Sequence, residues 1–319
     1  MKYKKRFSLN LHLDSLGESY GWPKNYNNDS AFTIGLERIS RILKKYKMPI
    51  TVFVIGKDLE NERNVKFLKK FINENDVEIA NHSYNHFFDL GSKSYNEIYQ
   101  EINYAHDIIY KKLKITSKGF CSPTWTFSKN VINVLTKLNY NYDTSNFNSL
   151  WLLPMMGKIF LNHLINFDLT KSLKIVKRRD YLQMLRHETK PYFVYKNFNS
   201  KSKNKLLEIP MPSSSKFQIP IWHTIGFMFG FEFLKKQILN HMNTNNFLNY
   251  VIHPADILIN RDLDRRYTNS LPRLDNNRLS SKIYNLEKIL EIVNDNHFSF
   301  IKMNDYFNNY VKKPIKINV

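Results

Sequence analysis

The chain has 319 residues, 42% hydrophobic and 14% aromatic, and its 48 Lys and Arg exceed its 28 Asp and Glu, for a formal net charge of +20. This apolar content excludes an intrinsically disordered chain, and the length suits one large domain or two smaller ones. A single cysteine, Cys121, excludes a scaffold held by internal disulfides and favours a reducing cytoplasm.

The first half of the chain alternates predicted strands and helices. Over 7–14, apolar side chains occupy the odd positions and polar ones the even positions, which is the period of a strand. The continuous apolar run 50–55 is typical of a strand buried on both faces. Ser94 and Glu97 predict a capping box that opens a long helix. The predicted strands are 7–14, 50–55, 77–82, 118–122 and 140–143, and the predicted helices are 31–46, 59–72, 94–113 and 128–138.

This alternation predicts an α/β fold of parallel strands with right-handed crossovers, closed as a barrel or open as a doubly wound sheet. An aromatic and basic segment then interrupts the rhythm, and we interpret 145–215 as an insertion within a single domain spanning 1–319. The alternation resumes with a helix at 231–242, a strand at 248–253, a helix at 281–293, a strand at 298–301 and a helix from 304.

No segment reaches the roughly 18 apolar residues that cross a bilayer, and the nearest candidates are 150–160 and 219–234. The basic start of the chain resembles that of a signal peptide, but Asn10, His12 and Asp14 lie where its apolar region would be. We therefore expect a cytoplasmic protein without an export signal.

The positive charge alone does not predict a nucleic-acid partner, because Lys, Asn, Ile, Tyr and Phe are all abundant, as an AT-rich coding sequence would produce. The basic cluster in 174–196 is interpreted as a solvated face. Alternatively it binds sugar-linked phosphate or contacts a membrane surface. No pattern in the sequence indicates an oligomeric state.

Three predicted strands end in ionisable side chains, namely Asp14, His82 and His253. The carboxyl ends of parallel strands gather at one edge of a sheet or barrel, so these side chains are expected to lie together. His86 follows His82 by four residues, a spacing that lets two histidines on a helical turn share one metal ion. Asp14 would complete a His₂Asp set with open positions for water and substrate.

The motifs occur in the chain order Asp14 at a strand end, His82-Ser83-x-x-His86, Phe120-Cys121-Ser122-Pro123 followed by Trp125, and Ile252-His253-Pro254. In this order the sequence resembles the polysaccharide deacetylases of the NodB homology type, carbohydrate esterase family four, over about residues 6–310. The resemblance implies a distorted (β/α) barrel, here of about seven strands. It also implies a hydrolase that removes an acyl group, usually N-acetyl, from an amino sugar with a divalent metal.

Carried over by resemblance, Asp14, His82 and His86 are the metal ligands. The family has a second aspartate, the general base, either two residues before the ligand or adjacent to it. We prefer the first register, which makes His12 the base, because His12 shares a strand face with Asp14. The second register would make Asp14 the base and leave Ser15 as a poor ligand. Zinc suits His₂Asp, although other first-row metals also bind such ligands.

The resemblance also assigns catalytic roles. By this resemblance His12 would accept a proton from the attacking water and His253 would protonate the departing amine. Apart from the resemblance, Asp143 is expected to orient or tune one of the histidines. The metal and a backbone N–H near the Pro123 turn would receive the oxyanion. Cys121 occupies the position of a family arginine and is interpreted as a small buried hydrophobe rather than a nucleophile. The candidate sugar-binding residues are Tyr84, Pro123, Trp125 and Trp222.

Several alternatives remain open. Since the base aspartate and the arginine are both replaced, the chain can be a catalytically impaired glycan-binding protein of the same fold. His12 can also be a core histidine that simply finds hydrogen-bond partners, and His253 can be a structural residue beside Pro254. A nucleic-acid or membrane-binding protein is the weakest hypothesis, since the sequence shows no recognisable nucleic-acid motif.

Overall fold

The computed structural model describes residues 4–16, 29–149, 188–194, 206–214, 218–263 and 278–312, together with positions 151, 157 and 274. Its strands are β1 (Arg6–Leu13), β2 (Ile50–Val54), β3 (Val77–Asn81), β4 (Gly119–Phe120), β5 (Tyr142–Asp143), β6 (Tyr192–Val194), β7 (Leu206–Glu208), β8 (Phe247–Ile252) and β9 (Ser299–Phe300). Its α-helices are α2 (Leu36–Tyr46), α3 (Glu62–Glu74), α4 (Tyr95–Leu113), α5 (Lys129–Lys137), α9 (His223–Phe229), α10 (Phe231–Thr244), α11 (Leu279–Asp295) and α12 (Met303–Lys312).

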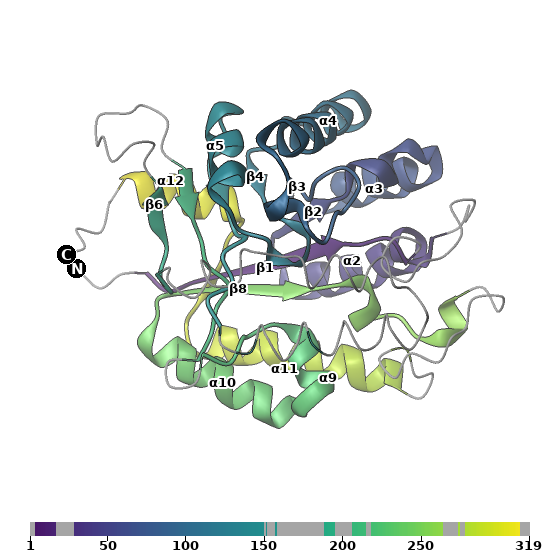
Figure 1. Ribbon diagram of the computed structural model, residues 1–319. Helices are drawn as coiled ribbons and strands as arrows, with labels where there is room; N and C mark the ends of the chain where they lie inside the picture. The colour runs from purple at the N-terminus through teal and green to yellow at the C-terminus, as the bar shows by residue number, and fades with distance from the viewer. Residues whose placement is uncertain are drawn as a thin grey trace.

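These strands form one sheet in the order β6-β7-β5-β4-β3-β2-β1-β8, with β9 paired to β1. Every pairing is parallel except the antiparallel pair β6–β7. Figure 1 shows α3, α4 and α5 above the strands and α9, α10 and α11 below them. Because helices cover both sides, central strands such as β2 are buried along their whole length.

The sheet is curled rather than flat, and one hydrogen bond demonstrates it. Asn249 in β8 donates through Nδ2 to Oγ1 of Thr144, directly after β5, at 2.8 Å. Four strands separate β5 from β8 in the sheet order, so only a strongly curved sheet brings the two residues together. The polar face of β1 lies in this interior, where Asn10 donates to Asn249. The polar alternation of β1 is therefore a buried network, not a solvated face.

The expected α/β fold of the distorted barrel type is confirmed, with the sheet curled into a half-barrel, and all seven predicted strands are present. Among the described residues the sheet has nine strands, because β6 and β7, which lie within 145–215, extend it. The prediction that this segment is an insertion in a single domain stays a prediction. Its basic residues Lys174, Lys177, Arg178, Arg179 and Arg186, and Lys196 beyond them, lie outside the described residues.

Local signals placed some elements well and missed others. Ser94 and Glu97 form the predicted capping box of α4. The helix α9 was not predicted, because its sequence is rich in aromatic and β-branched residues and holds Gly226, all weak helix formers. Within the described part of the chain, no helix combines the length and apolar character needed to traverse a bilayer.

Candidate metal centre and active site

The carboxyl ends of β1 and β3 bring three potential metal ligands together. Asp14 follows β1, and its Oδ1 lies 3.6 Å from Nε2 of His82 and 3.8 Å from Nε2 of His86. His82 is 1% exposed, whereas the Asp14 side chain is 16% exposed. Asp14 and His82, which follow two of the predicted strands, therefore lie together as expected, with His86 beside them.

His82 is oriented by its backbone and by its ring. Its N–H donates to the carbonyl of Val54 at 2.9 Å, which continues the β2–β3 ladder by one residue. Its Nδ1 lies 2.6 Å from the carbonyl oxygen of Cys121, which can only accept a hydrogen bond. Nδ1 therefore carries the proton, and the lone pair of Nε2 points toward Asp14. Burial lowers the pKa of His82 to about 4, so the ring stays neutral near pH 7.

The loop that carries the two histidines is not the helical turn that their spacing suggested. Ser83 and His86 adopt left-handed backbone angles, with φ of 62° and 55°, which a helix excludes. The buried carboxylate of Glu101 in α4 accepts from the backbone N–H groups of Tyr84 and Asn85 at 3.2 and 2.9 Å. Asn81 accepts from the N–H of Ser83 at 2.8 Å. These contacts pin the loop in the shape that directs both imidazoles toward Asp14.

Sequence reasoning missed Glu101, although a signal was present. It lies between Ile98 and Ile102 on the stripe of α4 that is otherwise apolar and buried. A carboxylate on such a stripe is costly to bury unless backbone or cationic donors satisfy it, so it indicates a structural or functional contact.

His12 and His253 adjoin the same cluster. The ring of His12 lies 4.6 Å from that of His82 and 5.3 Å from that of His253, centroid to centroid. Burial, and then the neighbouring histidines, lower the pKa of His12 well below its ordinary value. His12 is therefore a neutral imidazole whose Nε2 is buried without a hydrogen-bond partner among the described residues.

The residues present fit a divalent metal. Asp14 Oδ1 is buried without a hydrogen-bond partner in the described part of the chain, and two imidazole Nε2 atoms lie next to it. An orphaned carboxylate oxygen beside two imidazole nitrogens is the arrangement that a cation completes. Oxygen and nitrogen donors of this kind suit zinc and other first-row metals.

An aromatic wall borders the cluster. The ring of Trp125 lies 5.8 Å from that of His12 and 4.9 Å from that of Trp222. Phe147 stacks against Trp125 at 5.3 Å. Trp125 is 8% exposed and Trp222 is 3% exposed, so they form a packed wall that limits water around the histidines.

The turn after β4 holds the predicted Pro123 at the first position of the short helix η4 (Pro123–Trp125). The N–H of Ser122 donates to Oγ of Ser145 at 2.8 Å, and that of Trp125 donates to the Ser122 carbonyl at 3.1 Å. The N–H of Cys121 donates to the backbone carbonyl of Asn81 at 3.1 Å. These N–H groups of the turn are therefore already engaged and unavailable to an oxyanion. Burial raises the pKa of the Cys121 thiol well above its ordinary value, so it stays protonated.

Tyr84 is not brought to the cluster by any contact that the structure shows. Its hydroxyl donates to Glu60, and its ring packs edge-on against Tyr104 of α4 at 4.6 Å. The predicted role of Tyr84 in sugar binding therefore has no geometric support at the histidine cluster itself.

Asp143 is linked to the histidine cluster only indirectly. Its Oδ1 accepts from Oγ of Ser145 at 2.5 Å, and its carboxyl group pairs with that of Glu208. Burial raises the pKa of Asp143 to about 6 and that of Glu208 well above its ordinary value. Two buried carboxyls in contact share a proton at neutral pH. Asp143 reaches the site only through Ser145 and the backbone of Ser122.

This carboxyl pair predicts a pH-dependent stability. Both folded-state pKa values lie above those of the unfolded chain, so the folded state binds more protons, and stability falls as the pH rises from about 4 through 6 and beyond. Glu208→Gln retains a hydrogen-bond donor to Asp143 but removes one titrating group. We expect its melting temperature to fall less than that of the unsubstituted protein between about pH 5 and 8. Thermal unfolding at several pH values measures this. If the melting temperatures of the two proteins fell equally with pH, the assignment would be contradicted.

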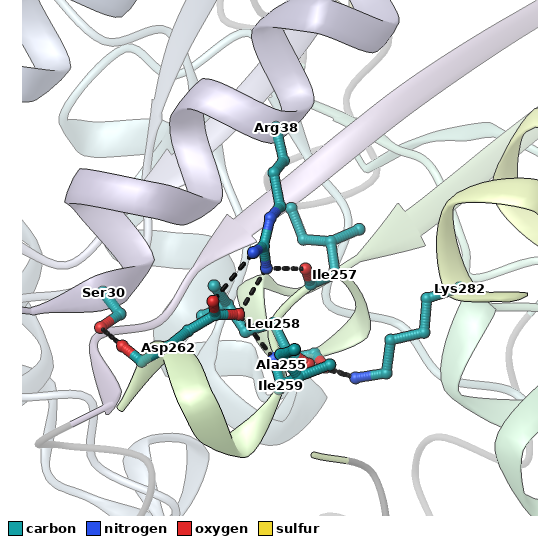
Figure 2. A network of polar contacts seen from close by, with 8 residues as sticks. All are labelled: Ser30, Arg38, Ala255, Ile257, Leu258, Ile259, Asp262 and Lys282. Atoms are coloured by element: carbon teal, nitrogen blue, oxygen red, sulfur yellow. Dashed lines mark hydrogen bonds and ion pairs between the residues drawn. The ribbon is translucent and has the colours of Figure 1, made fainter. Parts of the chain in front are cut away.

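Two cations hold the loop that follows His253, as Figure 2 shows. Arg38 from α2 forms a two-pronged ion pair with Asp262 and donates to the Ile257 carbonyl at 2.8 Å. Lys282 from α11 is 1% exposed and donates to the carbonyls of Ala255, at 2.9 Å, and Leu258. The loop is thus fixed from both sides, and the position of His253 with it.

His253 is further fixed by its own loop. Its N–H donates to Oδ2 of buried Asp256 at 2.8 Å, and the same oxygen lies 3.8 Å from its Nδ1. The backbone of His253 is therefore tied to Asp256, and the imidazole lies beside the same carboxylate.

The fold and the donor set define the class of protein: an α/β half-barrel of the NodB type with a His₂Asp group at its strand ends. Residues 29–142 match the polysaccharide deacetylase family, which confirms the resemblance inferred from the sequence. The matched segment contains His82 and His86 but not Asp14 or His253.

Comparison with individual proteins finds one relative by sequence and several structures of similar fold. The chain is 32% identical over 99 residues to the uncharacterized protein YlxY of Bacillus subtilis, a match that spans 31% of this chain and 30% of that protein. A structure from Mycobacterium smegmatis assigned to the polysaccharide deacetylases superposes with a TM-score of 0.59 at 13% identity, covering 98% of this chain and 93% of the other. A variant of BA3943, a CE4 family pseudoenzyme with restored activity, superposes at 0.50 and 13% identity, covering 96% and 69%. These structural similarities show the shared fold.

Proposed function

We propose that the protein is a metal-dependent hydrolase that removes an N-acyl group, in the simplest case N-acetyl, from an amino sugar of a polysaccharide, lipid-linked glycan or cell-wall precursor. The observation that carries the proposal is the convergence of Asp14, His82 and His86 at the strand ends, with His12 and His253 beside them. The deacetylase family match supports a carbohydrate substrate.

In this proposal Asp14, His82 and His86 hold a divalent metal, zinc in the first instance. When bound, such an ion polarises an acyl carbonyl and lowers the pKa of water. The register that makes Asp14 a ligand is favoured, since its Oδ1 faces both imidazoles.

The chain's own residues would move the protons. His12, neutral and with Nε2 unpartnered in the described structure, accepts a proton from water. His253, with Asp256 beside Nδ1, donates a proton to the departing amine. The wall of Trp125 and Trp222 limits access of bulk water to this transfer.

A second candidate is a glycan-binding protein without turnover. The lowered pKa of His12 makes it a weaker proton acceptor than an ordinary imidazole, which favours this reading. The similarity of fold to a CE4 pseudoenzyme is consistent with it.

Acetate release from N-acetylglucosamine oligomers by the zinc-loaded protein tests the proposal. We expect release with the unsubstituted protein and a large loss with His253→Ala, because the departing amine then lacks its proton donor. His297→Asn is the matched control, since His297 is exposed and its φ of 61° suits asparagine. Oligomer binding without acetate release would favour the glycan-binding candidate instead.

A further inference from the structure

A second group of potential ligands lies behind the first. One ligand atom each from His12, His82 and Cys121 lies within 4.8 Å of the other two. All three residues are buried, with exposures of 3%, 1% and 0%. Both groups contain His82. The inner group adds the imidazole of His12 and the sulfur of Cys121, whereas the outer group adds the carboxylate of Asp14 and the imidazole of His86.

Hydrogen bonding leaves the inner group ready for a ligand. His12 Nε2 is buried without a partner among the described residues, which is costly for a polar nitrogen. The Cys121 thiol has only weak acceptors, the carbonyls of Thr144 at 3.5 Å and Ser122 at 3.6 Å. A buried imidazole without a partner beside a loosely held thiol is what a soft cation would satisfy.

The two groups share His82, and this sharing links them. Its Nδ1 is committed to the Cys121 carbonyl, so Nε2 is the ring atom left for a metal. One lone pair binds one ion at a time, and therefore occupancy of one position excludes full ligation at the other. Donor type distinguishes the positions, since thiolate selects soft ions more strongly than carboxylate does.

We propose that His12, His82 and Cys121 form an inner site for a thiophilic divalent cation, and that an ion bound there competes with the metal of the Asp14, His82 and His86 set. On binding, the Cys121 thiol loses its proton to solvent and the sulfur forms a bond to the cation, with no change of oxidation state. The competing role rests on the proposed function, whereas the inner site itself does not.

Titration of the purified full chain with Cd²⁺ tests the inner site. Cys121 is the sole cysteine of the sequence, so any thiolate-to-cadmium absorption band arises from it. We expect the band to saturate at about one cadmium per chain. His12→Ala is expected to raise the cadmium concentration at half-saturation by about tenfold or more. Cys121→Ser should remove the band. His86→Ala, which disrupts only the outer set, is the matched control and should keep it.

Three outcomes would overturn the proposal: no band in the unsubstituted protein, a band unaffected by His12→Ala, or saturation with two chains per cadmium. Prior loading with Zn²⁺ should raise the half-saturation point, and independence from zinc would overturn the competition through His82. If Cys121→Ser fails to fold, X-ray absorption of the unsubstituted cadmium protein decides, since a sulfur neighbour is required. Absence of acetate release with a normal cadmium band would refute the hydrolase alone.

Discussion

His82→Ala is expected to abolish stoichiometric binding of zinc and, with it, acetate release from N-acetylated oligomers. His82 supplies the ring that belongs to both ligand groups, and its Nδ1 contact with Cys121 fixes the direction of Nε2. Losing an outer partner of a metal ligand costs about 10–100-fold in affinity or activity, and losing the ligand itself should cost more. Isothermal titration with Zn²⁺ and an acetate assay measure the two effects.

The control for this substitution is another partly buried histidine away from the cluster. His106 in α4 has Nδ1 3.2 Å from the hydroxyl of Tyr140 and contacts none of the candidate ligands that the structure shows. His106→Ala should lower stability slightly and leave zinc binding intact. Equal zinc affinity in the His82→Ala and unsubstituted proteins would refute the ligand assignment.

Lys282→Met is expected to lower the free energy of unfolding by about 2–5 kcal/mol, because the carbonyls of Ala255 and Leu258 then lose a buried donor. Methionine keeps most of the side-chain volume, so the loss reports the missing hydrogen bonds rather than a cavity. Urea unfolding measures the change.

Lys288→Met in the same helix provides the comparison. Lys288 pairs with Glu291 at the surface, and such exposed substitutions change stability by no more than about 0.5 kcal/mol. If Lys282→Met proved as stable as Lys288→Met, the buried lysine would not be what holds the His253 loop.

The sequence was sufficient to predict the convergence of Asp14, His82 and His253. Each of these residues follows a strand whose period is visible in the chain, and alternation with helices makes the strands parallel. Strand ends that point the same way bring their side chains to one edge, so no long-range information was needed.

Other features depend on contacts that local patterns do not encode. The strands β6 and β7 have three residues each, and their place is set by pairing with distant partners, such as Leu207 with Tyr142. The shape of the loop around Ser83 depends on Glu101, about twenty residues further on. The direction of the Tyr84 side chain follows from that loop shape, so residue spacing alone could not predict it.

Several residues around the site hold left-handed backbone angles without being glycine, among them Ser83, His86, Thr124 and Trp125. Each such residue costs about 1–3 kcal/mol, which surrounding contacts must offset. Glycine would relieve the cost at Ser83 but would also let the loop sample other shapes. The protein therefore trades stability for a preorganised site, and selection for thermostability alone would be expected to erode these positions first.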